Sequence, residues 1–90
     1  MLRSFWENHP DSEQPLKAWF TEAKRATWQS PNEIKEQFKS ASILRERRVV
    51  FNIAGNKYRL VVRINYMAQI VFIRFIGLHE EYDEIKVEET

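Results

Sequence analysis

The segment from Lys57 to Tyr66 constrains the fold more than any other part of the chain, because polar and apolar residues alternate along it. This period of two predicts a β-strand with one face on the core, since successive side chains of a strand point to opposite faces of the sheet. One face collects the large apolar residues Tyr58, Leu60, Val62, Ile64 and Tyr66. The other face collects Lys57, Arg59, Val61, Arg63 and Asn65.

Two neighbouring segments also have the composition of strands. Arg48 to Ile53 is rich in β-branched and aromatic residues, and a turn at 54–56 follows it. A turn at 67–69 leads to a third strand from Ile70 to Ile76. Regular alternation within this strand groups Val71, Ile73 and Phe75 on one face, opposite Arg74, Ile70, Phe72 and Ile76. Three consecutive strands with short connections predict an antiparallel meander.

The first half of the chain predicts helices. A short helix is expected from Leu2 to Asn8, and a longer one from Asp11 to about Ala26, with Asp11 as its N-cap and Gln14 completing a capping box. The longer helix has one apolar stripe at helical spacing, formed by Leu16, Trp19, Phe20 and Ala23. Ser30, Pro31 and Glu33 predict the start of a third helix that ends near Lys39. We therefore expect one α+β domain over residues 1–90, with helices from about 2 to 39 packed on one face of a small three-stranded antiparallel sheet from about 48 to 76.

Composition narrows the setting in which this domain works. The chain has 90 residues, enough for one domain, and no cysteine, which excludes disulfides, thiolate metal sites and cysteine nucleophiles. No apolar run has the length of a membrane span, and the first residues lack the apolar stretch of a signal peptide. We expect a cytoplasmic protein with no membrane partner.

The net charge of +1 hides an uneven distribution along the chain. Between residues 45 and 76 there are seven basic residues and one acid, whereas residues 77–90 contain six acids and one lysine. The basic part is either a solvated surface, a surface neutralised by the acidic tail, or a binding site for an anion. We favour the last interpretation, because Lys57, Arg59 and Arg63 emerge on one face and arginine binds phosphate through its planar set of donors. Arg74 joins them if the register permits, and Arg48 and Asn52 on the preceding strand are further candidates for RNA binding.

The segment 77–83, Gly-Leu-His-Glu-Glu-Tyr-Asp, follows the third strand directly and is a candidate catalytic segment, extending to about residue 85. A lone histidine is more often structural than catalytic. His79 is a stronger candidate because Tyr82 and Asp83 are close to it in the sequence and arginines are expected nearby. These groups suit metal-free RNA cleavage, in which the ribose 2′-OH loses a proton, the leaving 5′-oxygen gains one, and cations stabilise the phosphorane. No metal-site or nucleotide-binding motif is present, so we expect neither a metal nor a cofactor.

Two motifs in the second half resemble the HigB-type toxins of bacterial toxin–antitoxin systems. They are the stretch from Arg48 to Val62, RVVFNIAGNKYRLVV, and the stretch from Ile73 to Asp83, IRFIGLHEEYD. Phe5-Trp6, His9-Pro10-Asp11, Leu16-Lys17-Ala18-Trp19 and Trp28-Gln29-Ser30-Pro31 extend the resemblance through the first half. Members usually begin with a short strand before the first helix, so either that strand lies upstream of this sequence or the sheet lacks it.

The resemblance implies the RelE-like microbial ribonuclease fold and a growth-inhibiting enzyme that cleaves mRNA, often on the translating ribosome. It implies that Arg59, Arg74, His79 and Tyr82 are catalytic, and Asp83 is a further candidate to support acid–base chemistry. Lys57 and Arg63 are RNA-binding candidates from the strand periodicity alone. A cognate antitoxin, of the helix-turn-helix type, is the implied partner, and DNA would be contacted only through the antitoxin complex. We expect its apolar anchors to dock on the helices, where Trp19 or Trp28 would be partly exposed.

Two alternatives remain. The same fold could act without nucleolysis by binding a protein such as DNA gyrase, although such a binder does not need the set of residues from His79 to Asp83. The domain could also bind RNA without cleaving it, although single-strand binders usually stack bases on exposed rings and few aromatic residues are expected on the polar face of the sheet.

Overall fold

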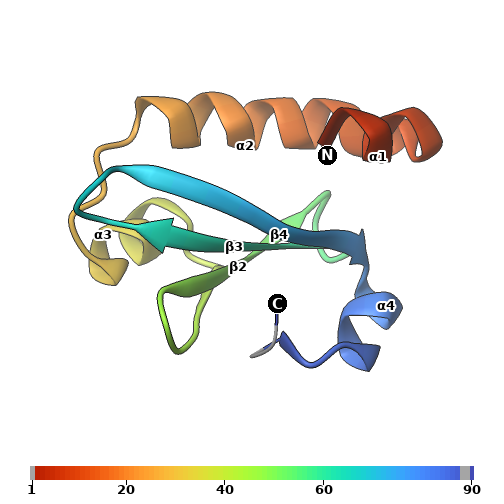
Figure 1. Ribbon diagram of the computed structural model, residues 1–90. Helices are drawn as coiled ribbons and strands as arrows, with labels where there is room; N and C mark the ends of the chain where they lie inside the picture. Colours follow the sequence, from red (N-terminus) through yellow and green to blue (C-terminus); the bar gives the residue numbers. More distant parts are fainter. Residues whose placement is uncertain (1, 88–89) are drawn as a thin grey trace.

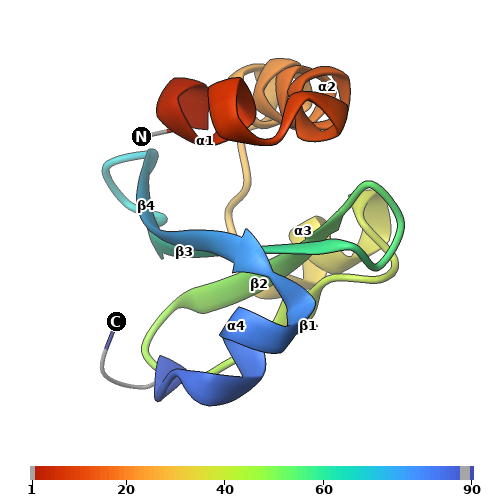
Figure 2. The same ribbon diagram turned by 90° about the vertical axis from the view of Figure 1, so that its right-hand side faces the viewer.

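A computed structural model describes residues 2–87 and 90 and shows the first two helices on one side of an antiparallel sheet (Figure 1). Helix α1 (Leu2–Asn8) and the 3₁₀ turn η1 (Pro10–Ser12) lead into helix α2 (Glu13–Arg25). Figure 2 shows α1 and α2 side by side over one face of the sheet. Helix α3 (Pro31–Gln37) follows after an extended connection. The three expected helices are confirmed, and α3 ends slightly before the predicted residue.

The sheet has four strands, in the order β1-β2-β3-β4, all antiparallel. They are β1 (Ser42–Ile43), β2 (Arg48–Ile53), β3 (Tyr58–Asn65) and β4 (Ile70–Leu78). The predicted meander of three strands is correct for β2 to β4 and omits β1. The connection from β1 to β2 is a tight hairpin in which Glu46 and Arg47 take φ values of 56° and 65°. Hairpin turns with positive φ values usually contain Asn-Gly or Asp-Gly, which allows their prediction from sequence. This turn contains no glycine, so the sequence did not indicate it.

The core lies between α2 and the sheet. Leu16 and Trp19 of α2, Trp28 and Ile34 pack against alternate residues of the strands. The strand residues on this face are Val49, Phe51 and Ile53 of β2, and Tyr58, Leu60, Val62 and Ile64 of β3. The predicted buried face of β3 is therefore confirmed. Phe20, the fourth residue of the α2 stripe, is 52% exposed and is not part of this core.

The predicted helix caps are wrong in their chemistry although the helix positions are right. Asp11 does not cap α2; it lies in η1, and its carboxylate accepts hydrogen bonds from the Tyr58 hydroxyl at 2.5 Å and from the Lys57 ammonium. Ser30 precedes α3 as its N-cap, but its side chain makes no capping hydrogen bond. The carboxylate of Asp11 instead ties the helical layer to the start of β3.

A β-bulge in β4 changes which residues face the helices. The partner of Val61 is Phe75 and the partner of Val62 is Ile73, so Arg74 is the extra residue. Beyond the bulge, Ile76 packs with the core and Phe75 lies on the opposite face, which reverses the prediction for both residues. A bulge shifts the alternation by one residue, and a regular period of two cannot reveal it.

Helix α4 (His79–Glu84) follows β4 directly and lies on the face of the sheet away from α1 and α2 (Figures 1 and 2). The C-terminal segment was expected to be catalytic, but its helical form was not predicted. None of the helices within residues 2–87 and 90 is both long and apolar enough to span a bilayer.

Candidate active site on the open face of the sheet

The face of the sheet opposite α1 and α2, called here the open face, carries the arginines. Its side chains are fixed by the strand register, in which Asn52 pairs with Arg59, Val50 with Val61, and Arg48 with Arg63. Strand β4 adds Ile70, Phe72, Phe75 and Gly77 to this face. Val50 and Val61 in its centre are buried, so the open face has an apolar middle and a basic group at each end.

At the first end, Arg48 and Arg63 are direct cross-strand neighbours, and like charges in such positions repel. Arg48 is only 5% exposed, and its guanidinium donates to the Glu46 carboxylate at 2.9 Å and to the main-chain oxygen of Thr90 at 3.0 and 3.2 Å. The Arg48 guanidinium is the main reason that the pKa of Glu46 is lowered from its usual value. The hydrogen-bonding groups of Arg48 are therefore engaged by other residues of the chain. Arg63 is the partly exposed arginine at this end.

The bonds of Arg48 bear on the alternative that the acidic tail folds back to neutralise the basic face. The chain does return to the sheet at Thr90, but the contact uses a main-chain oxygen. Glu88 and Glu89, which belong to the tail in that hypothesis, lie outside the described residues. Among the residues described, the carboxylate paired with Arg48 comes from the β1–β2 turn.

The second end of the open face is built around the junction of β4 and α4. The main-chain N–H of His79 donates to the carbonyl of Lys57 at 3.1 Å, so α4 begins beside the start of β3. Glu81 fixes the same junction, since its carboxylate accepts the N–H of Leu78 at 2.7 Å. A Cβ on Gly77 would lie 2.7 Å from the Phe75 ring and 3.0 Å from the Glu81 carboxylate. A side chain at this position would have to displace the Phe75 ring, and glycine avoids that displacement.

His79 and Asp83 face each other on one side of α4, four residues apart. The His79 Nε2 atom lies 3.6 Å from the Asp83 carboxylate, and both side chains remain solvent-accessible, at 45% and 62%. Tyr82, also on α4, is partly exposed. Arg59 lies on the open face, and its cross-strand partner is Gly77, which precedes His79 by two residues in the chain. The imidazole and the carboxylate are thus a candidate pair for proton transfer at a phosphodiester, and Arg59 lies at the same end of the sheet.

Lys57 was predicted to share the polar face of the strand with Arg59 and Arg63, but its side chain is turned to the helical layer. It precedes β3 and its ammonium pairs with Asp11 of η1. This bond is the main cause of the raised pKa of Lys57 and of the lowered pKa of Asp11. The alternation that begins at Tyr58 does not govern a residue in the turn before it.

Two other predicted residues are only partly brought into the site. Arg74 is exposed on the edge strand and, as the bulge residue, has no direct partner on β3; Arg63 pairs with Phe72 instead. Asn52 pairs with Arg59 in the register, but its side-chain amide donates to the main-chain oxygen of Ser40 at 3.2 Å.

The structure places two aromatic residues on the open face that were not among the predicted site residues: Phe72, expected on the face of Arg74, and Phe75, expected on the opposite face. Phe72 is 46% exposed on the open face beside Arg63, and Phe75 lies on the same face beside Val61. No three His, Asp or Glu side chains within residues 2–87 and 90 are grouped as ligands for a metal ion.

Comparisons with known proteins identify the family of this chain. Residues 12–85 match the family described as HigB_toxin, RelE-like toxic component of a toxin-antitoxin system. The mRNA interferase toxin HigB of Escherichia coli strain K12 is 27% identical over 84 residues, covering 91% of this chain and 81% of the relative. The mRNA interferase HigB of Shigella flexneri gives the same values, and that of Escherichia coli O6:H1 is 24% identical over 79 residues, covering 86% and 77%. The matched region contains β2, β3, β4 and α4, and thus both ends of the open face. The chain therefore belongs to the HigB family, the RelE-like toxins of toxin–antitoxin systems.

Proposed function

We propose that this toxin is an endoribonuclease that cleaves mRNA without a metal ion, with its active site at the α4 end of the open face. The observation that carries the proposal is the position of His79, paired with Asp83, at the same end of the sheet as Arg59. The relatives that are named mRNA interferases support the substrate.

The proposed reaction is an internal transfer at phosphorus. The ribose 2′-oxygen forms a bond to the adjacent phosphorus and loses its proton, while the bond from phosphorus to the 5′-oxygen breaks and that oxygen gains a proton. The products are a 2′,3′-cyclic phosphate and a 5′-hydroxyl. His79 moves one of these two protons, Asp83 holds the imidazole in position, and Tyr82 is the candidate for the other proton. Arg59 stabilises the charge that develops on the phosphorane oxygens.

The rest of the open face supplies a path for the RNA chain. Arg63 offers a cation to a phosphate, and the exposed ring of Phe72 offers a surface on which a base can stack. Arg48 is left out of the proposal because its guanidinium is buried and engaged. Arg74 is retained as a candidate from the resemblance, with its exposed position on the edge strand.

The histidines of the chain provide a matched test of the site. His79→Ala should abolish cleavage of mRNA by the purified protein and growth arrest on expression. His9→Gln is the control, because His9 stacks on Phe5 in the helical layer with ring centroids 4.2 Å apart, away from the open face. Circular dichroism would confirm that both variants are folded. Equal activity of the two variants would remove His79 from the mechanism.

Ribosome dependence, the kind of antitoxin and the compartment complete the proposal. We place cleavage on mRNA during translation in the cytoplasm, and inhibition by a helix-turn-helix antitoxin through which alone the complex would contact DNA. Cleavage of the same RNA with and without translation measures the first point. Full activity on free RNA, unchanged by ribosomes, would contradict it.

A further inference from the structure

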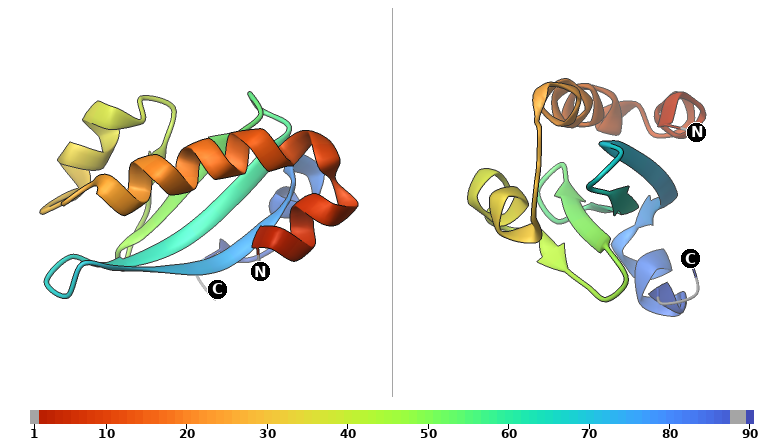
Figure 3. Two further views of the ribbon diagram at one scale, coloured as in Figure 1. Left: turned by 90° about the horizontal axis from the view of Figure 1, so that it is seen from above. Right: turned by 60° about the vertical axis from the view of Figure 1, so that its left-hand side comes forward.

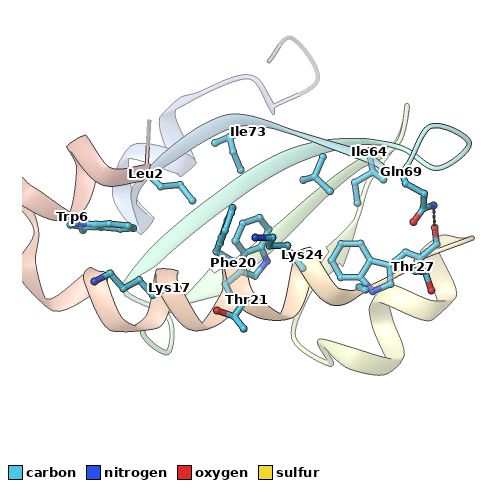
Figure 4. A pocket seen from close by; sticks show the side chains of 15 residues that line it. Leu2, Trp6, Lys17, Phe20, Thr21, Lys24, Thr27, Ile64, Gln69 and Ile73 are labelled. Atoms are coloured by element: carbon cyan, nitrogen blue, oxygen red, sulfur yellow. Dashed lines mark hydrogen bonds between the residues drawn. The ribbon is translucent and has the colours of Figure 1, made fainter.

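A groove on the helical side of the molecule borders the core and lies outside the proposed active site. It has a volume of about 900 Å³ and lies between α1 and α2 on one side and β3 and β4 on the other. Figure 4 looks into it, with Phe20 and Lys24 of α2 facing Ile73 of β4. Most of its lining is apolar, and β4 contributes Val71 and Ile73 to it. Seen from above, α2 crosses the sheet obliquely and leaves part of β4 uncovered (Figure 3).

The groove exists because the helices cover β4 less well than β3. On the helical face of β3, Val62 and Ile64 are fully buried, whereas their partners on β4, Ile73 and Val71, remain partly exposed. Phe20, which lines the groove with Val71 and Ile73, is 52% exposed. Trp19 and Trp28, which were expected to offer partly exposed surface to a partner, are both buried. Phe20 is the exposed aromatic residue of the groove lining.

Strand β4 is also an open edge. It is nine residues long and pairs with β3 on one side, and no other strand in the described part of the chain pairs with its outer side. Alternate main-chain N–H and C=O groups along this edge therefore point outward, which is the arrangement to which an added strand hydrogen-bonds. A strand placed there would direct every second side chain toward the groove.

The charges around the groove select the chemistry of the occupant. The two charged residues of its lining are Lys17 and Lys24, and the lining contains no acid. Arg74 stands at the midpoint of the β4 edge. Two copies of this chain that paired antiparallel about the centre of β4 would bring their Arg74 side chains together, which disfavours a symmetric dimer at this edge. A partner with acidic residues meets no such repulsion.

We propose that an extended segment of the antitoxin adds to β4 as a fifth strand, with apolar side chains in the groove and acidic side chains toward Lys24 and Arg74. The proposal rests on the toxin assignment and identifies the surface that the partner uses. The docking surface lies on the helical side of the sheet, away from His79 and Asp83. Neutralisation through it would require the rest of the antitoxin to reach the open face, or the added strand to shift β4 and with it α4.

Hydrogen exchange of the toxin, alone and with its purified antitoxin, tests the strand. The probe is the product of the short reading frame that we expect beside the toxin gene. The outward main-chain amides of Ile70–Leu78 should exchange at least about tenfold more slowly in the complex, because they gain hydrogen bonds. Protection confined to α2, with β4 unchanged, would mean a helix in the groove and would overturn the proposal. Protection of β4 without antitoxin, rising with toxin concentration, would indicate a second copy and would overturn it too.

A pair of variants tests the groove. Phe20→Glu places a carboxylate where an apolar anchor should be buried, and should weaken antitoxin binding roughly 10- to 100-fold. Met67→Glu is the control, because Met67 is 97% exposed and lies in the β3–β4 turn, outside the groove lining. Equal affinity of the two variants would contradict the proposal. Both variants should cleave RNA as well as the unsubstituted protein does. If none of the three proteins cleaves RNA, the proposed ribonuclease activity is wrong, but the antitoxin affinities still test the docking surface.

Discussion

Asp11 shows how a single carboxylate links the helical layer to the sheet. Its pKa is lowered, first by the hydrogen bond from Lys57 and then by that from Tyr58. Because the folded-state pKa lies below the ordinary 3.8, this contribution to stability is complete above that value and is lost as the pH falls through the folded-state pKa. Asp11→Asn should therefore lower the free energy of unfolding at pH 7 and have progressively less effect below about pH 4. Urea unfolding of both proteins at several pH values measures this, and a difference that is constant with pH would contradict it.

Phe72 permits a residue-scale test of RNA binding. If a base stacks on its exposed ring, Phe72→Ala should weaken binding of single-stranded RNA by roughly tenfold or more. Ile43→Ala is a suitable control, since Ile43 is also an exposed apolar strand residue but lies on β1 and on the other face. Fluorescence anisotropy with a labelled RNA would give both affinities. An unchanged affinity for the Phe72 variant would remove the stacking surface.

The face of the sheet on which a residue lies could be predicted where the residue belongs to a strand with a regular alternation. The alternation through Tyr58 and Leu60 placed Arg59 and Arg63 on the face away from the helices, as the structure has them. It misplaced Lys57, because the contact with Asp11 joins residues 46 positions apart and no local pattern encodes it.

At the scale of elements, the junction of β4 and α4 holds the proposed catalytic residues. Gly77→Ala would drive a methyl group into the Phe75 ring and the Glu81 carboxylate, at a cost of about 1–3 kcal/mol. Displacement of Glu81 would free the start of α4 and move His79, so cleavage should fall much more than stability does. Gly55→Ala is the control: its φ of 68° makes alanine unfavourable, but nothing lies within 4 Å. Activity assays and thermal unfolding on both variants separate the effects, and similar activity in the two would refute this role of Gly77.

Some helices and strands could be predicted from the sequence and others could not. The helices and the strands β2 to β4 follow from strong periodicity and composition. Strand β1 has only two residues, and its hairpin uses non-glycine residues with positive φ. The bulge at Arg74 depends on the register between β3 and β4, a property of two strands together that the sequence of one strand does not contain.

At the scale of the whole molecule, the sheet separates two surfaces, a helical side with the core and groove and an open face with the arginines and His79. The charge asymmetry in the sequence indicated a basic surface, but neither the occupation of Arg48 nor the groove at β4 could be inferred from it. Both depend on how segments distant in sequence pack in three dimensions.

The open face should show the salt dependence of a phosphate-binding surface. The logarithm of the RNA binding constant should fall linearly with the logarithm of salt concentration, and Arg63→Ala should reduce the slope by about 0.7 if Arg63 neutralises one phosphate. Arg25→Ala, at the end of α2 on the helical side, should leave the slope unchanged. An identical slope for all three proteins would exclude Arg63 from the RNA path.

The chemistry of the cleaved ends tests the central claim most directly. RNA cleaved by the purified toxin in the presence of a chelator would be analysed by mass spectrometry, with the His79→Ala protein in parallel. The proposed mechanism predicts 5′-hydroxyl ends and 2′,3′-cyclic phosphates or the 3′-phosphates that form from them, undiminished by the chelator and absent with His79→Ala. Cleavage that stops in the chelator and returns with magnesium, or that leaves 5′-phosphate and 3′-hydroxyl ends, would contradict it.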